Sequence, residues 1–201
     1  MLVLYYAPRT RSIRVRWLLE ELGLPHVLRR VTFVPPKTAF SQSTPLGKLP
    51  VIEDGDVTMG ESGAIIEYIL ERYGNGRLAP PIGSPLRGEF LQWMHYAEGT
   101  AFPPLGVIIW HTLYAEDADN YYPEVIASAK DRARGALNVV ERSLDGKKYL
   151  LGSDFSAADI MMGFTLGVAR MFGVLDDSLP NLQAYFARLE ERPAFKSSVE
   201  M

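Results

Sequence analysis

Two short segments carry groups suited to holding a small peptide. Leu49 and Pro50 precede an apolar run that starts at Val51. Because proline cannot donate to a strand ladder, the backbone of Leu49 is open to an extended peptide. Further along, Glu61 and Ser62 stand where a helix is expected to begin. The first N–H groups of a helix are unpaired and lie at the positive end of its dipole, so the pattern predicts a peptide-binding surface that favours a carboxylate.

The chain contains no cysteine. This excludes disulfides, thiolate metal sites and a cysteine nucleophile, so any thiol chemistry must use a thiol that the ligand supplies. The three histidines, His26, His95 and His111, show neither an i, i+4 pair nor a carboxylate set at metal-ligand spacing. We therefore expect no metal, and we expect each histidine to be structural.

Charge and hydrophobicity limit the partners of the chain. Of its 201 residues 47% are hydrophobic and the net charge is -3, which indicates an ordinary globular protein. No basic stretch alternates with aromatic residues, so neither nucleic acid nor anionic lipid is expected as a partner. No run approaches the ~18 apolar residues of a membrane span. Met1 to Tyr6 lacks a basic lead and soon meets Pro8, which favours a strand over a signal peptide. We therefore expect a cytoplasmic protein.

The predicted secondary structure that must position these groups changes near residue 75, from a mixture of strands and helices to helices alone. Before it, short apolar runs alternate with helical patterns, and Asp54-Gly55 is a strong hairpin signal. The expected strands are Leu2 to Tyr6, Val27 to Val31, Val51 to Ile52 and Val57 to Met59, and the expected helices are Ser12 to Leu22 and Glu61 to Arg72. This is the pattern of a small α/β domain.

Residues 74–85 contain three glycines and three prolines, which is typical of a linker. The periodicity after it is helical. The expected helices are Leu86 to His111, Pro123 to Leu144, Ala157 to Met171 and Leu182 to Glu191. We therefore predict an α/β domain over residues 1–75, a linker over 76–85 and an all-α domain over 86–201.

The segment from Phe155 to Ile160 predicts a buried helix start. Ser156 is the expected N-cap, Asp159 its reciprocal partner three residues later, and Phe155 with Ile160 the hydrophobic staple. The following residues are apolar nearly all round, so this helix is expected at the centre of its domain. The motif serves folding rather than chemistry.

Four segments resemble the cytosolic glutathione transferases of the bacterial kind. They are Tyr5 to Gly23, Pro45 to Val51, Glu61 to Tyr68 and Phe155 to Asp159. The resemblance covers essentially the whole chain. It implies an α/β thioredoxin-like N-terminal domain, an all-α C-terminal helical domain, a cis bond before Pro50, a homodimer and a role in detoxification.

The resemblance also assigns roles to the peptide-binding residues, with glutathione as co-substrate. Leu49, followed by Pro50, would pair with the cysteinyl part, while Glu61 and Ser62 would take the γ-glutamyl end. The cation for the glycyl carboxylate would come from Lys37, Lys48 or Arg11. The family often has Asn where this chain has Thr44, so the resemblance assigns no ligand contact to that side chain.

The chemistry that the resemblance implies is activation of the glutathione thiol. Lowering a thiol pKa of ~8.5 by two units requires ~2.7 kcal/mol of thiolate stabilisation. The helix that begins near Ser12 and a nearby hydroxyl are the two sources. Tyr5 matches the catalytic position of tyrosine-type transferases, whereas cysteine-type relatives have their cysteine at Arg11. The alternatives for the group nearest the sulfur are thus Tyr5, Thr10, Arg11 and Ser12.

A small hydrophobic electrophile would bind on the helical domain. Phe102, Trp110 and Tyr114 are the predicted pocket wall, because Gly99 and Pro103-Pro104 bend the helix near them.

These residues leave three hypotheses for the function of the chain. The first is a transferase with a glutathione peroxidase side activity. The second is a non-catalytic ligand-binding or assembly module, and the third is a glutathione-dependent isomerase, dehalogenase or disulfide reductase.

Overall fold

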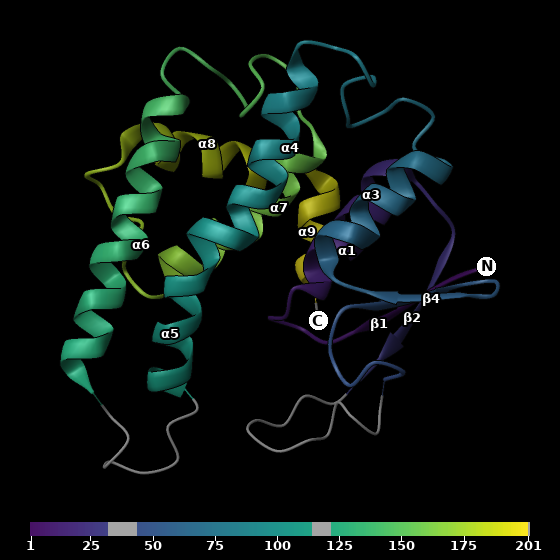
Figure 1. Cartoon of the computed structure of the whole chain (residues 1–201), viewed down its shortest axis with the longest axis horizontal. Coiled ribbons are helices and arrows are strands. Elements are labelled where there is room, and N and C mark those ends of the chain that lie inside the picture. The colour runs from purple at the N-terminus through teal and green to yellow at the C-terminus, as the bar shows by residue number, and fades with distance from the viewer. Residues whose placement is uncertain (32–43, 114–121, 201) are drawn as a thin grey trace. The chain divides into compact units, whose positions relative to one another are not determined.

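The computed structural model describes residues 1–31, 44–113 and 122–200 (Figure 1). The chain divides into two compact units. The first consists of residues 1–82 and 190–201, and the second of residues 83–189. The expected boundaries differ from these units mainly at the C-terminus, where the last twelve residues join the first unit.

The first unit contains a four-stranded mixed sheet in the order β2-β1-β3-β4. β1 is parallel to β2 and antiparallel to β3, and β3 forms a hairpin with β4. The strands are β1 (Leu2–Tyr6), β2 (His26–Arg30), β3 (Val51–Asp54) and β4 (Val57–Gly60). The four expected strands are confirmed, with the second shifted by one residue.

Two helices, α1 (Ser12–Leu22) and α3 (Ser62–Tyr73), pack against each other on one side of this sheet (Figure 1). Leu4 and Ile52 pair across β1 and β3 and are almost fully buried. Side chains alternate along a strand, so Tyr5 and Val51 lie on the opposite face. This is the predicted α/β thioredoxin-like arrangement.

A short C-terminal helix, α9 (Pro193–Val199), packs on α1. The rings of Trp17 and Phe195 meet edge to face, with 4.9 Å between their centroids. Glu21 accepts hydrogen bonds from the Arg192 guanidinium at 2.6 and 2.7 Å, and one from the Trp17 indole at 2.9 Å. These contacts join α9 to the first unit, although the sequence pattern placed this segment in the helical domain.

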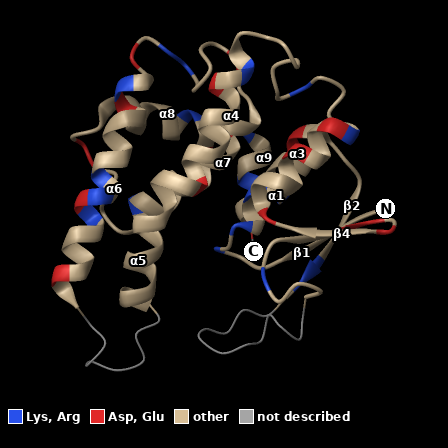
Figure 2. Ribbon diagram, in the orientation of Figure 1, with Lys and Arg blue, Asp and Glu red and all other residues tan. Residues whose placement is uncertain are grey.

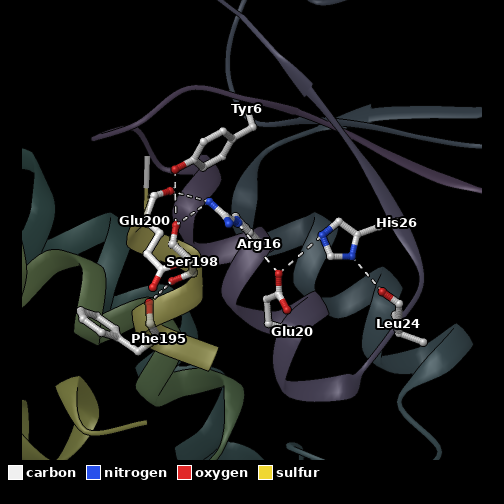
Figure 3. Close-up of polar contacts among 8 residues, drawn as sticks. All are labelled: Tyr6, Arg16, Glu20, Leu24, His26, Phe195, Ser198 and Glu200. Atoms are coloured by element: carbon white, nitrogen blue, oxygen red, sulfur yellow. Dashed lines mark hydrogen bonds and ion pairs between the residues drawn. The ribbon is translucent and has the colours of Figure 1, made fainter. Parts of the chain in front are cut away.

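The end of α9 and the residue after it are also held by α1 and β1 (Figure 3). The Arg16 guanidinium donates to the carbonyl oxygens of Ser198 and Glu200, at 3.5 and 2.9 Å. The Tyr6 hydroxyl donates to the same Ser198 oxygen at 3.4 Å. Tyr6 therefore supports the C-terminus, on the sheet face opposite Tyr5.

The docking of α9 predicts that Glu21→Ala destabilises the protein by about 1–2 kcal/mol, because one part-buried carboxylate accepts three hydrogen bonds. The measurement is urea unfolding of the whole chain. Glu191→Ala, at an exposed neighbouring carboxylate, is the matched control and should change the free energy of unfolding little. Equal effects of the two substitutions would contradict the role given to Glu21.

The second unit is helical. Its elements are α4 (Leu86–Tyr96), a π-helical turn η1 (Ala97–Ala101), α5 (Phe102–Leu113), α6 (Pro123–Ser143), α7 (Ala157–Met171) and α8 (Pro180–Glu190). The expected bend near Gly99 is the π turn, which interrupts the ladder between α4 and α5. α5 carries no Lys, Arg, Asp or Glu, whereas α6 carries both signs of charge along its length (Figure 2).

α7 lies at the centre of the second unit, with most of its residues buried. Its start is the predicted capping box of Ser156 and Asp159. The Asp159 carboxylate accepts from the Ser156 N–H at 2.8 Å and the Ser156 hydroxyl at 3.0 Å. It also accepts from the Leu150 N–H at 3.0 Å and the Tyr185 hydroxyl at 2.8 Å. The cap thus joins three segments of the unit.

Candidate functional site

The strand register brings three segments together at one end of the sheet. Tyr5 pairs with Val51, and Val51 pairs with Gly60. The chain after β1, the chain before β3 and the chain after β4 therefore emerge at the same end. These segments are residues 7–12, 44–50 and 61–62, and they carry most of the residues that the sequence singled out.

The segment before β3 ends in the predicted peptide-binding pair. The Leu49-Pro50 bond is cis, as the resemblance implied. Leu49 is half-buried and packs on the cluster that contains Tyr5 and Val51. Thr44 donates its hydroxyl to the backbone oxygen of Lys48 at 3.0 Å. Thr44 therefore holds the loop in shape, and the Lys48 side chain is exposed beside it.

The segment after β4 is the start of α3. Glu61 is the N-cap, with φ of 65° and ψ of 107°, a conformation that non-glycine residues rarely adopt. Its side chain is exposed and does not cap the helix. Ser62 is the first helical residue and is 4% exposed. The helix has no acidic residue in its first turn, so its positive end keeps the capacity to bind an anion.

The loop between β1 and α1 holds two hydroxyl groups in contact. Thr10 Oγ1 and Ser12 Oγ are 2.6 Å apart. Both are within hydrogen-bond reach of the Ala7 carbonyl oxygen, at 2.8 Å for Thr10 and 3.0 Å for Ser12. Ser12 also accepts from the Ala7 N–H at 3.2 Å and is fully buried, whereas Thr10 is half-buried.

Arg11 is the N-cap of α1 and is half-buried. Ser12 is the first residue of this helix. Arg9 precedes them, exposed, with φ of 61°. The two non-glycine residues with positive φ at this end of the sheet, Arg9 and Glu61, thus flank the two helix starts.

Tyr5 has its hydroxyl engaged elsewhere on the sheet. It donates to Glu53 at 2.7 Å and accepts from the Arg29 guanidinium, which also lies 4.9 Å from the centre of its ring. The hydrogen bond to Glu53 raises the pKa of Tyr5. The one hydroxyl proton of Tyr5 is therefore already donated to a carboxylate. Thr10 and Ser12 differ, because their two hydroxyl protons have each other's oxygen and the Ala7 carbonyl as acceptors.

A buried arginine that the sequence interpretation did not single out joins the two helix starts. Arg14 is fully buried and donates from Nη1 to Ser62 Oγ at 3.1 Å. The available signal was its place in α1, between the buried Ile13 and Val15 and one turn before the buried Leu18. Its partner stands 48 residues away, which periodicity alone does not reveal.

Four further residues that the sequence singled out belong to the second unit or lie outside the described residues. In the second unit, Phe102 is buried and stacks on Phe164 with 5.9 Å between centroids, while Trp110 is 56% exposed on α5. Lys37 and Tyr114 lie outside the described residues.

Over residues 1–31, 44–113 and 122–200 there is no group of three His, Asp or Glu side chains placed to hold a metal ion. His26 bonds the Leu24 oxygen at 2.8 Å and lies 3.9 Å from Glu20 (Figure 3). Within the same described stretches, none of the helices is sufficiently long and apolar to span a bilayer.

A thioredoxin-like unit followed by a helical unit defines a two-domain protein of the thioredoxin-fold class. The glutathione S-transferase N-terminal domain model matches residues 4–79, and the C-terminal domain model matches residues 101–193. Together the matches cover most of the chain. The chain therefore belongs to the cytosolic glutathione transferase family.

Individual relatives agree with this assignment. Glutathione S-transferase 3 of Schizosaccharomyces pombe is 26% identical, over 100% of this chain and 87% of its own length. The glutathione S-transferase-like protein OpS6 of Beauveria bassiana is 32% identical, over 91% and 87%. A glutathione transferase family member from Pseudomonas fluorescens, solved with two glutathione bound, has a TM-score of 0.83 and 25% identity, over 99% of this chain and 92% of that one.

Proposed function

We propose that this protein is a glutathione transferase that binds glutathione at the shared end of the sheet and ionises its thiol. The supporting observation is the convergence of three chemically distinct groups: an edge backbone at Leu49 and Pro50, a helix start at Glu61 and Ser62, and a hydroxyl pair at Thr10 and Ser12. These match the three needs of an extended tripeptide thiol.

In this proposal glutathione lies extended, with its cysteinyl backbone paired to Leu49. The γ-glutamyl carboxylate receives the Ser62 hydroxyl and the N–H groups at the start of α3. The Glu61 carboxylate faces the γ-glutamyl ammonium. The glycyl carboxylate takes Lys48 or Arg11 as its cation, with Lys37 as a third candidate from outside the described residues.

Thr10 is the proposed donor to the sulfur. Thr10 and Ser12 have two hydroxyl protons, and both oxygens are within bonding distance of the Ala7 carbonyl. If Ser12 keeps its bond to that carbonyl, the Thr10 proton turns to the thiolate and no backbone group loses its partner. Ser12, being fully buried, then positions Thr10. Arg11 and the start of α1 add positive potential at the thiolate.

The thiolate would then attack a small hydrophobic electrophile. We propose that the electrophile binds on helices of the second unit, where the exposed Trp110 is a better candidate for the wall than the buried Phe102. Tyr114 stays a candidate from outside the described residues. A peroxidase side activity uses the same thiolate.

We also propose that the protein is a homodimer in the cytoplasm and has a role in detoxification, in keeping with the family.

A disulfide reductase that uses glutathione is the second candidate. The relative from Pseudomonas fluorescens was solved with two glutathione bound. Reduction of a disulfide uses two glutathiones, because one thiolate attacks it and releases the first thiol, and the second displaces the other thiol to give glutathione disulfide. The chain has no cysteine, so its own side chains form no mixed disulfide in such a reaction. Activity with a small disulfide substrate, compared with activity with an electrophilic carbon, distinguishes the two functions.

The proposal predicts that Ser62→Ala raises the KM for glutathione roughly five- to tenfold, as expected for the loss of one hydrogen bond to a charged group. Steady-state kinetics at fixed electrophile measure it. Thr58→Ala, at an exposed hydroxyl on β4 of the same unit, is the control and should leave KM unchanged. An unchanged KM for Ser62→Ala would remove this residue from the site.

Calorimetry with the wild-type chain tests the proposal as a whole. We expect one glutathione to bind per chain at millimolar ligand or below. An absence of heat at that concentration would rule out both enzymatic hypotheses and favour the non-catalytic module.

A further inference from the structure

We infer that Arg14 is a positioning residue that commits the Ser62 hydroxyl to donate toward the γ-glutamyl carboxylate of the ligand. This inference rests on the proposed function and identifies a residue that acts through Ser62. It begins from the contact between Arg14 Nη1 and Ser62 Oγ, which are 3.1 Å apart between two buried side chains.

The donor inventory of the two side chains sets the direction of this hydrogen bond. A guanidinium has donors only, so the Ser62 oxygen must be the acceptor. The Ser62 hydroxyl proton then points away from Arg14 and needs another acceptor. A carboxylate has acceptors only, so Ser62 meets it as the donor, and the bond from Arg14 directs the hydroxyl proton toward that donor role.

The position of Ser62 gives that proton a target. Ser62 is the first residue of α3, where the N–H groups and the helix dipole also favour an anion. The preceding Glu61 is held at φ of 65°, which turns the chain sharply into the helix. The Ser62 hydroxyl, the unpaired N–H groups at the start of α3 and the dipole of that helix therefore all favour the γ-glutamyl carboxylate at this position.

The charge of Arg14 adds to the effect. A hydroxyl oxygen that accepts from a cation is polarised, so its own O–H becomes a stronger donor. The guanidinium is fully buried, so solvent screens it weakly. Arg14 thus strengthens recognition of the carboxylate without touching the ligand. It also joins α1 to α3, the helices whose starts carry the thiol-activating and carboxylate-binding groups.

The test compares two ligands on the same variants. One is glutathione, and the other is an analogue whose γ-glutamyl residue is replaced by 4-aminobutyryl, which removes only the α-carboxylate. For Arg14→Met we expect the KM for glutathione to rise about tenfold with kcat nearly unchanged, and the KM for the analogue to stay within about twofold of the wild-type value. Arg14→Lys, which keeps a charged donor, should recover part of the loss. Arg72→Met on α3 is the control and should behave as wild type.

A structural role alone would raise KM for both ligands alike, or lower kcat, and either result overturns the inference. An unchanged KM for glutathione overturns it as well. A wild-type chain that fails to bind glutathione overturns the proposed function itself. If no Arg14 variant folds by circular dichroism, Ser62→Ala keeps the inference falsifiable, because its penalty must appear with glutathione and vanish with the analogue.

Discussion

Asp159→Ala should lower the free energy of unfolding by about 4 kcal/mol or more, the largest effect that we expect from a single substitution. The carboxylate is fully buried and accepts four hydrogen bonds from three segments. Burial raises the pKa of Asp159, and these hydrogen bonds counter part of that shift. Alanine leaves a hole, and the donors of Leu150, Ser156 and Tyr185 lose this acceptor.

Chemical denaturation of the whole chain measures this loss. Asp154→Ala is the matched control, because Asp154 lies five residues earlier, is exposed, and bonds the exposed Ser153 hydroxyl. We expect this control to stay within about 0.5 kcal/mol of the wild type. Equal losses of unfolding free energy in Asp159→Ala and Asp154→Ala would show that the capping box does not contribute the stability that its contacts indicate.

Thr10→Val should raise the pKa of the glutathione thiol in the complex by roughly one unit and lower kcat/KM below neutral pH about tenfold, since one donor to a developing anion is lost while Arg11 and the start of α1 still stabilise the thiolate. Valine keeps the shape of threonine and removes only the hydroxyl. Tyr5→Phe is the matched comparison, because it also removes one hydroxyl. In that variant we expect the thiol pKa to be unchanged, since Tyr5 donates to Glu53.

The comparison separates the two hydroxyls directly. The ultraviolet absorbance of the bound thiolate, followed against pH for each variant, reports the thiol pKa. A shift in Tyr5→Phe with none in Thr10→Val would restore the tyrosine-type mechanism. Ser12→Ala should give a smaller shift than Thr10→Val, because Ser12 acts through the orientation of Thr10.

Much of the fold could be predicted because its signals are local. Asp54-Gly55 predicted the β3–β4 hairpin, and Ser156 with Asp159 predicted the start of α7. Proline and glycine content predicted a linker over residues 76–85, and the two compact units divide at Ile82 and Gly83. Each of these depends on residues a few positions apart, whose preferences hold with or without tertiary contacts.

The features that could not be predicted depend on contacts distant in sequence. Alternation along β1 shows that Tyr5 and Tyr6 face opposite sides, but not which side carries α1. The position of α9 depends on the contact between Arg192 and Glu21, which are 171 residues apart. Without its contact to Ser62, Arg14 resembles any surface arginine of a helix.

In the candidate site, too, features that depend on neighbouring residues could be predicted, and features that depend on residues distant in sequence could not. The sequence predicted one peptide-binding surface from two segments, Leu49-Pro50 and Glu61-Ser62, and the strand register explains why these segments meet. The choice among hydroxyls needed geometry, because only the contacts show that Tyr5 is engaged with Glu53 while Thr10 pairs with Ser12.

The central claim is that this chain binds glutathione and lowers the pKa of its thiol. The measurement that tests it most directly is the ultraviolet absorbance of the thiolate in the wild-type complex, titrated from about pH 5 to pH 10. We predict a midpoint near ~6.5, about two units below the free thiol at ~8.5. Affinity for glutathione should then rise with pH between these values, because the complex releases a proton there. A midpoint that stays near ~8.5 in a saturated complex would contradict the account.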